Sequence, residues 1–272
     1  MSAPRQVRRR GVYLLPNLLT TLALFAGFYA IVAAIDGNFD AAGIAIFVAM
    51  FMDGADGRVA RMTSTQSDFG KEYDSLSDMI SFGLAPAVVV YQWGVARLAE
   101  YSVAWGRVGW LVAFLFAVSA ALRLARFNTL PSKLGKAWFQ GLPSPSAAAM
   151  VAAFVWLSAE YGIGGFAGLI IAFAVTAMAG VLMVSNLRYY SFKQMSQKRV
   201  VPFAALLLVP LIIALISINP PVVLFLLAFS YALSGPILMI VNREPVHRVM
   251  FDDDADEDDT EETDDKIRDL HG

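Results

Sequence analysis

The sequence contains no cysteine and only two histidines. The lack of cysteine excludes disulfide bonds, thiolate metal sites and a cysteine nucleophile. Both histidines, His247 and His271, lie near the C-terminus, which leaves little room for histidine-based catalysis or for a metal site built from imidazoles. Charged side chains are also scarce, because they make up 16% of the 272 residues where an average soluble domain has about 25%.

Apolar residues make up 57% of the chain and are gathered into long uncharged runs. Several runs approach the length of about 20 residues that a helix needs to cross a hydrocarbon core of roughly 30 Å. The pattern predicts an all-α polytopic membrane protein with about eight transmembrane helices. The expected spans are Leu18–Ile35, Ala41–Met62, Asp74–Trp93, Val108–Phe127, Ser146–Leu157 extended to about Tyr161, Gly164–Val184, Phe203–Ile218 and Val222–Ile240.

Composition divides the chain into two regions. Residues 1–250, which begin with a basic segment at 1–14, form the expected integral-membrane domain and would carry any catalytic site. Residues 251–272 hold more than half of the 23 acidic residues of the chain. Such a segment cannot bury enough apolar surface to order itself, so we expect a disordered tail.

Positive charge is distributed unevenly between the loops that join the predicted spans. If the N-terminus lies in the cytoplasm, all of the 21 lysines and arginines except Arg97 and Arg107 fall on the cytoplasmic side. Cytoplasmic loops of membrane proteins carry such an excess. The distribution therefore predicts an even number of spans, with both termini in the cytoplasm. The expected location is the bacterial inner membrane.

One polar stretch, "FMDGADGRVARMTSTQSDFGKEYDSLSDMISFG" from Phe51 to Gly83, interrupts the apolar runs. Asp53 and Asp56 are spaced i, i+3 on the second predicted span, and Asp74 and Asp78 are spaced i, i+4 on the third, so each pair shares a helix face. Two adjacent helices would thus point four carboxylates at one another. A proton or a divalent cation relieves their repulsion, and oxygen-only ligands suit Mg²⁺, Mn²⁺ or Ca²⁺.

Two alternatives compete with a catalytic metal site. The aspartates could lie in a polar layer at the helix ends and pair with Arg58, Arg61 and Lys71. The presence of four aspartates at this spacing disfavours such pairing, because ionisable groups inside a span are costly. A divalent-metal transporter is the second alternative. The carboxylates cluster toward one membrane face and no internal repeat is visible, which disfavours transport. Asp68 and Glu72 are assigned to the solvated loop between the two helices.

The acidic and small residues of this stretch follow a fixed pattern: Asp56-Gly57, two spacers, Ala60-Arg61, eight spacers, Gly70, three spacers, Asp74, three spacers and Asp78, with Asp53 upstream. The pattern resembles the signature of the CDP-alcohol phosphotransferase family. The resemblance implies a six-helix membrane core, usually homodimeric, that binds a CDP-linked lipid at the cytoplasmic face. It also implies that an alcohol displaces CMP from this lipid.

The same resemblance implies a role for each residue of the pattern. The implied ligands of a divalent metal pair, Mg²⁺ or Mn²⁺, are Asp53, Asp56, Asp74 and Asp78. The residues that it places at the CDP-lipid site are Gly57, Ala60, Arg61 and Gly70. Asp78 would also act as the general base that takes the proton of the acceptor hydroxyl, Gly57 would make room for the nucleotide, and Arg61 would hold a phosphate.

Further segments resemble the branch of the family whose acceptor is serine. They are Tyr13–Thr20, Tyr73–Ala87, Ala121–Asn128, Phe139–Ala149 and Met183–Lys193. The expected partners are therefore CDP-diacylglycerol, L-serine and membrane lipids, with no nucleic acid. The remaining alternatives within the family are glycerol 3-phosphate or inositol phosphate as acceptor, and another donor lipid.

Three residues at the cytoplasmic end of the fourth predicted span are candidates for binding the acceptor. Arg123 and Arg126 carry guanidinium groups, whose forked N–H donors suit the carboxylate of serine, and Asn128 follows them. The alternative for the arginines is simple anchoring of the helix end on the positively charged side of the membrane.

Overall fold

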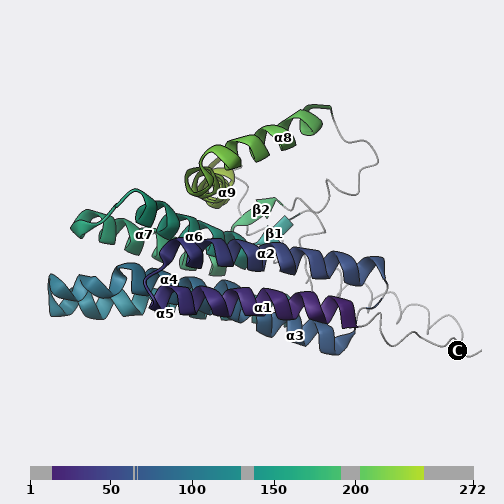
Figure 1. Ribbon diagram of the computed structural model, residues 1–272, viewed down its shortest axis with the longest axis horizontal. Helices are drawn as coiled ribbons and strands as arrows, with labels where there is room; N and C mark the ends of the chain where they lie inside the picture. Colours follow the sequence, from purple (N-terminus) through teal and green to yellow (C-terminus); the bar gives the residue numbers. More distant parts are fainter. Residues whose placement is uncertain (1–13, 64, 66, 130–137, 191–202, 242–272) are drawn as a thin grey trace, which may run out of the picture. The chain divides into compact units, whose positions relative to one another are not determined.

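The computed structural model describes residues 14–63, 65, 67–129, 138–190 and 203–241, and these are mostly helical (Figure 1). The elements are α1 (Leu14–Ile35), α2 (Phe39–Met62), α3 (Asp68–Asp78), the π-helical turn η2 (Met79–Leu84), α4 (Ala85–Trp93), the 3₁₀ helix η3 (Val95–Glu100), α5 (Val103–Thr129), β1 (Trp138–Gln140), α6 (Ser144–Glu160), α7 (Gly165–Val184), β2 (Arg188–Tyr190), α8 (Phe203–Ile218) and α9 (Pro220–Val241). The predictions for the basic segment at 1–14 and for the acidic tail fall essentially outside these residues.

Each predicted span contains a helix, which confirms the helical fold class, but one boundary was wrong. The third span begins at Asp68 rather than at Asp74, and α3, η2 and α4 then follow one another without a break. The earlier start has a local cause, since Ser67 caps α3 by accepting a hydrogen bond of 3.0 Å from the backbone N–H of Gly70. Asp68 and Glu72 therefore lie in the first turns of a helix, and not in a solvated loop.

Four of the described helices are long and apolar enough, by length and composition, to cross a membrane. They are Leu15–Ile35, Val103–Thr129, Gly165–Val184 and Pro220–Val241. Helix α2 carries four charged residues of the polar stretch, while α6 and α8 have only 17 and 16 residues. The number of eight spans therefore stays a prediction.

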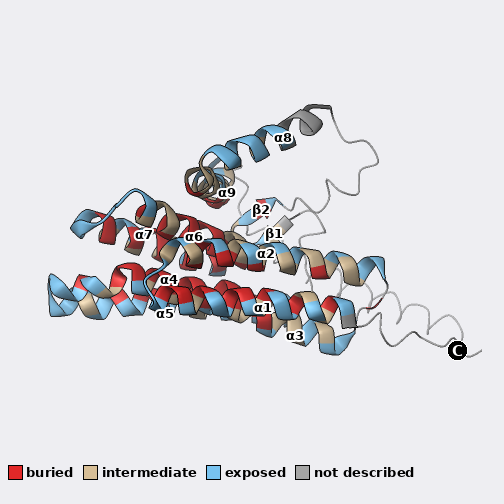
Figure 2. Ribbon diagram, viewed as in Figure 1, coloured by how far each residue is buried: buried red, intermediate tan, exposed pale blue. Residues whose placement is uncertain are grey.

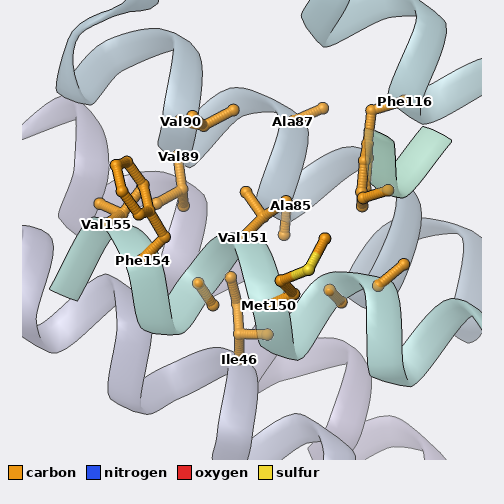
Figure 3. Packing of buried hydrophobic residues seen from close by; sticks show 14 of the residues in the cluster. Ile46, Ala85, Ala87, Val89, Val90, Phe116, Met150, Val151, Phe154 and Val155 are labelled. Atoms are coloured by element: carbon orange, nitrogen blue, oxygen red, sulfur yellow. The ribbon is translucent and has the colours of Figure 1, made fainter. Parts of the chain in front are cut away.

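Small residues allow the helices to pack closely. Helix α1 packs along α2, α2 also contacts α6, and α5 packs along α7. The buried faces stand out on α1, α4 and α6 (Figure 2), and Figure 3 shows part of the core, where Ile46 of α2, Phe116 of α5 and Met150 of α6 belong to one apolar cluster. Large apolar side chains such as Phe25 and Phe114 point outward instead, as expected where lipid is the solvent.

A short antiparallel pair of strands, β1 and β2, was not predicted. Phe139 lies opposite Tyr189, and the backbone N–H of Gly141 donates to the carbonyl of Leu187 at 2.8 Å. Tyr189 is fully buried and its hydroxyl donates to the carbonyl of Ala232 in α9 at 2.9 Å. Burial raises the pKa of Tyr189, so its phenol stays a donor. The strand pair thus joins the start of α6 to the end of α7 and to α9.

We predict that Gly141→Ala destabilises this junction. Gly141 has a φ of +75°, and an added Cβ would lie 2.3 Å from the carbonyl oxygen of Met183. Gly162→Ala is the matched control, because Gly162 has a φ of +62° but nothing within 4 Å of its Cβ position. The left-handed conformation alone costs a non-glycine residue about 1–2 kcal/mol. Thermal unfolding in detergent should show a clearly larger loss for Gly141→Ala, and equal losses would contradict this explanation.

Candidate active site

Helices α2 and α3 bring the predicted carboxylates together. Asp53 and Asp56 on α2 and Asp74 on α3 each offer one oxygen, and these three oxygens lie within 4.8 Å of one another. Asp56 is buried, with 5% of its surface exposed. Asp78, one helical turn after Asp74, lies beside Asp53 within reach of a hydrogen bond between the two carboxyl groups. All four acidic side chains of the motif therefore converge on one place.

The Oδ1 atom of Asp74 tests whether this place suits a cation. It is buried and has no hydrogen-bond partner among the described residues. Buried polar atoms ordinarily have a partner, and an oxygen that faces other carboxylates gains one only through a proton or a cation. Hard divalent cations prefer such oxygen-only surroundings. The residues present thus fit a divalent metal, with Asp53, Asp56 and Asp74 placed to hold it.

Helix α1 supplies polar partners to this cluster that the sequence interpretation missed. The hydroxyl of Thr20 donates to Oδ2 of Asp56 at 2.6 Å, and Thr20 is itself buried. On the next residue, the hydroxyl of Thr21 lies 2.9 Å from that of Tyr73 on α3. In the sequence, the only indication of these polar partners was the pair Thr20-Thr21 within an otherwise apolar run. Its partners, however, are set by the packing of α1 against α2 and α3.

The small residues of the motif have identifiable neighbours. An added Cβ at Gly70 would lie 3.1 Å from Oγ of Ser67 and 3.4 Å from Oδ1 of Asn17, so Gly70 makes room for the cap of α3 and for α1. At Gly57 an added Cβ would lie 3.4 Å from a guanidinium nitrogen of Arg61. Ala60 is half-buried one turn later. Arg61 is exposed and lies near Asp56, where its positive charge can meet a phosphate.

Of the three acceptor candidates on α5, Arg123 lies deepest. Its Nη1 donates to Oγ of Ser144, the first residue of α6, at 2.8 Å, and its guanidinium lies near Asp78. The Nε atom of Arg123 is buried and has no partner among the described residues. A buried guanidinium N–H without a partner is costly and is satisfied by an anionic ligand. Ser144 belongs to a segment that carried the family resemblance, but no role was predicted for it.

The other two candidates are held by protein side chains. Arg126 donates through Nη2 to Oδ1 of Asn186 at 2.9 Å, and Gln140 donates to the same oxygen at 3.0 Å. Asn128 donates through Nδ2 to Oγ of Ser75 at 2.9 Å. Because Ser75 follows Asp74 directly, this bond ties the end of α5 to the helix that carries two of the carboxylates. Asn128 thus contacts α3.

The comparisons with known proteins agree with the site. The family model for CDP-alcohol phosphatidyltransferases matches residues 13–185, a stretch that includes the whole acidic motif and the α5 candidates. The chain belongs to this family, and the prediction of family is confirmed. Its members depend on a divalent metal, in agreement with the acidic cluster. Family membership and the apolar helices together make the protein an integral membrane protein, and they leave the transporter alternative without support.

Several relatives are similar over most of their length. A protein of Helicobacter pylori named CDP-diacylglycerol–serine O-phosphatidyltransferase is 36% identical over 228 residues, covering 83% of this chain and 91% of the relative. One of the same name from Mycobacterium tuberculosis is 37% identical over 226 residues, covering 79% and 75%. The archaetidylserine synthase of Methanothermobacter thermautotrophicus is 38% identical over 177 residues, covering 64% and 69%.

We predict that Asn128 acts through Ser75. Asn128→Ala, Ser75→Ala and the double variant should each lower the rate of CMP release, and the double variant should be no slower than the slower single variant. Both substitutions remove the same hydrogen bond, so their effects overlap instead of adding. Multiplying effects, together with a raised KM for the acceptor in Asn128→Ala alone, would instead show that Asn128 contacts the acceptor.

Proposed function

We propose that the protein transfers the phosphatidyl group of CDP-diacylglycerol to the hydroxyl group of L-serine, giving phosphatidylserine and CMP. The observation that carries the proposal is the similarity to relatives named for this reaction over most of both chains. The carboxylate cluster supports it, since it offers the oxygen ligands that a metal-dependent transfer of a substituted phosphate needs.

In this reaction the serine oxygen attacks the phosphorus that carries diacylglycerol. The bond from that phosphorus to the oxygen of CMP breaks, and CMP leaves with the bonding electrons. Divalent metal ions, when bound, neutralise the pyrophosphate charge and favour both attack and departure. No protein nucleophile is required, which agrees with a chain that has no cysteine.

The side chains of the cluster divide the remaining tasks. Asp53, Asp56 and Asp74 hold the metal. We assign Asp78 as a further ligand and as the general base that accepts the serine hydroxyl proton, because its carboxyl group is buried among the others and lies near Arg123. The CDP group is assigned to the surface around Gly57, Ala60, Arg61 and Gly70. Arg61, the exposed cation of this surface, binds a phosphate there.

We propose that Arg123 binds the carboxylate of serine. Its unpartnered Nε–H needs an acceptor, and its proximity to Asp78 would bring the bound serine close to the general base. Arg126 lies on the same helix, one turn after Arg123, and is held by Asn186 near the strand pair. We propose that Arg126 assists in binding the acceptor at the entrance of its site.

Four further features belong to the proposal. The metal is Mg²⁺ or Mn²⁺, with two ions in each site. The protein is a homodimer. It lies in the bacterial inner membrane with both termini in the cytoplasm, as the distribution of lysine and arginine favours. The site opens at the cytoplasmic face, where soluble serine can reach it.

The acceptor is tested directly by CMP release from purified protein supplied with CDP-diacylglycerol, Mg²⁺ or Mn²⁺, and one alcohol at a time. We expect release with L-serine and only background release with glycerol 3-phosphate or inositol phosphate. Release with either of these and not with serine would overturn the acceptor assignment. Because one relative is an archaetidylserine synthase, the same assay with a CDP-linked archaeal ether lipid would test the donor.

We predict that Arg123→Lys raises the KM for serine by about tenfold or more while the KM for CDP-diacylglycerol changes little. Lysine keeps the charge but loses the forked pair of donors, and a hydrogen bond to a charged group is worth about 1.5–3 kcal/mol. Ser144→Ala is the comparison variant. It removes only the partner of Nη1 and keeps the guanidinium, so it should raise the KM for serine less than Arg123→Lys does. An unchanged KM for serine in Arg123→Lys would contradict the placement.

A further inference from the structure

We infer that Thr20 is a positioning residue that orients the carboxylate of Asp56 for metal binding and sets the distance between the two acidic helices. The inference rests on the metal site of the proposed function and goes beyond it, because Thr20 lies on α1, outside the acidic motif, and is not itself a ligand. It follows from a series of hydrogen bonds between α1 and the helices that carry the carboxylates.

The side chain of Thr20 has two possible acceptors and one proton. Its Oγ1 lies 2.6 Å from Oδ2 of Asp56 and 3.1 Å from the carbonyl oxygen of Pro16. The bond to an ionised carboxylate is shorter and stronger than the bond to a carbonyl, so the proton lies toward Asp56. This proton and the backbone N–H of Gly57 both bond to the carboxylate of Asp56. Such partners behind a metal ligand fix its orientation.

The backbone of Thr20 holds the second acidic helix. Oγ of Ser77 donates to the carbonyl of Thr20 at 3.2 Å. Ser77 is buried, and in the sequence it lies between Asp74 and Asp78. One residue of α1 is therefore bonded to α2 through its side chain and to α3 through its main chain. Since the three ligand oxygens come from both helices, their separation depends on this double attachment.

A second serine continues the attachment past the site. Oγ of Ser81 donates to the carbonyl of Ala23 at 3.1 Å. The two serines are four residues apart, whereas their acceptors on α1 are three apart. Ser81 lies in the π-helical turn η2, so the hydrogen bonds to α1 continue from α3 into this turn. An added Cβ at Gly27 would lie 2.7 Å from Cα of Ser81, which shows how closely α1 and η2 approach.

Binding of Mn²⁺ to the purified, full-length protein tests the inference without any substrate. Electron paramagnetic resonance measures free Mn²⁺ during a titration of wild type, Thr20→Val and Thr20→Ser. We expect Thr20→Val, which keeps the shape and loses the hydroxyl, to weaken the affinity by about tenfold or more. Thr20→Ser keeps the hydroxyl and should restore the wild-type affinity. Thr21→Val is the matched control, because among the described residues the hydroxyl of Thr21 bonds to the carbonyl of Asn17 and to the hydroxyl of Tyr73, and not to a carboxylate.

Each outcome of the titration decides one question. Wild-type affinity in Thr20→Val would overturn the inference while leaving the metal site intact. Equal loss in Thr20→Ser and Thr20→Val would also overturn it, because the hydroxyl would then not be the cause. A wild-type protein that binds no Mn²⁺ would overturn the metal site and the inference together. Unfolding temperatures of the variants separate these results from a loss of fold.

Discussion

The repulsion among four carboxylates is the constraint on which the rest of the structure depends. Asp53, Asp56, Asp74 and Asp78 come from two helices of a membrane bundle, where charge is expensive, and their carboxyl groups converge on one place. A cation resolves the repulsion, and the unpartnered oxygen of Asp74 marks where the cluster lacks a partner. The surrounding helices hold the carboxylates together until that cation is bound.

The elements around the cluster contribute to it in different ways. Helix α1 bonds to both acidic helices through Thr20 and the serines of α3 and η2. Helix α5 brings Arg123 toward Asp78 from another direction, and Ser144 at the start of α6 holds the guanidinium there. The strand pair, which lies next to the start of α6 and the end of α7, is bonded to α9 through Tyr189.

The convergence of the acidic residues was predictable because it depends on spacing along two adjacent helices. Periodicity fixes which side chains share a face, and the motif identified the family that the comparisons confirm. The early start of α3 was also readable from Ser67, a good cap, but that signal was overlooked. The bonds of Thr20, Ser77 and Ser144 were not predictable, because each joins segments far apart in sequence. The π-helical turn η2 was not predicted either, and its Ser81 bonds to Ala23 of the distant helix α1.

Anomalous diffraction from crystals grown with Mn²⁺ and CDP-diacylglycerol would show whether these carboxylates form a divalent metal site. We expect anomalous peaks within coordinating distance of Asp53, Asp56 and Asp74, between these side chains and the pyrophosphate. Ordered CDP-lipid with no anomalous peak at the carboxylates, or Mn²⁺ bound only elsewhere, would show that they do not form this site.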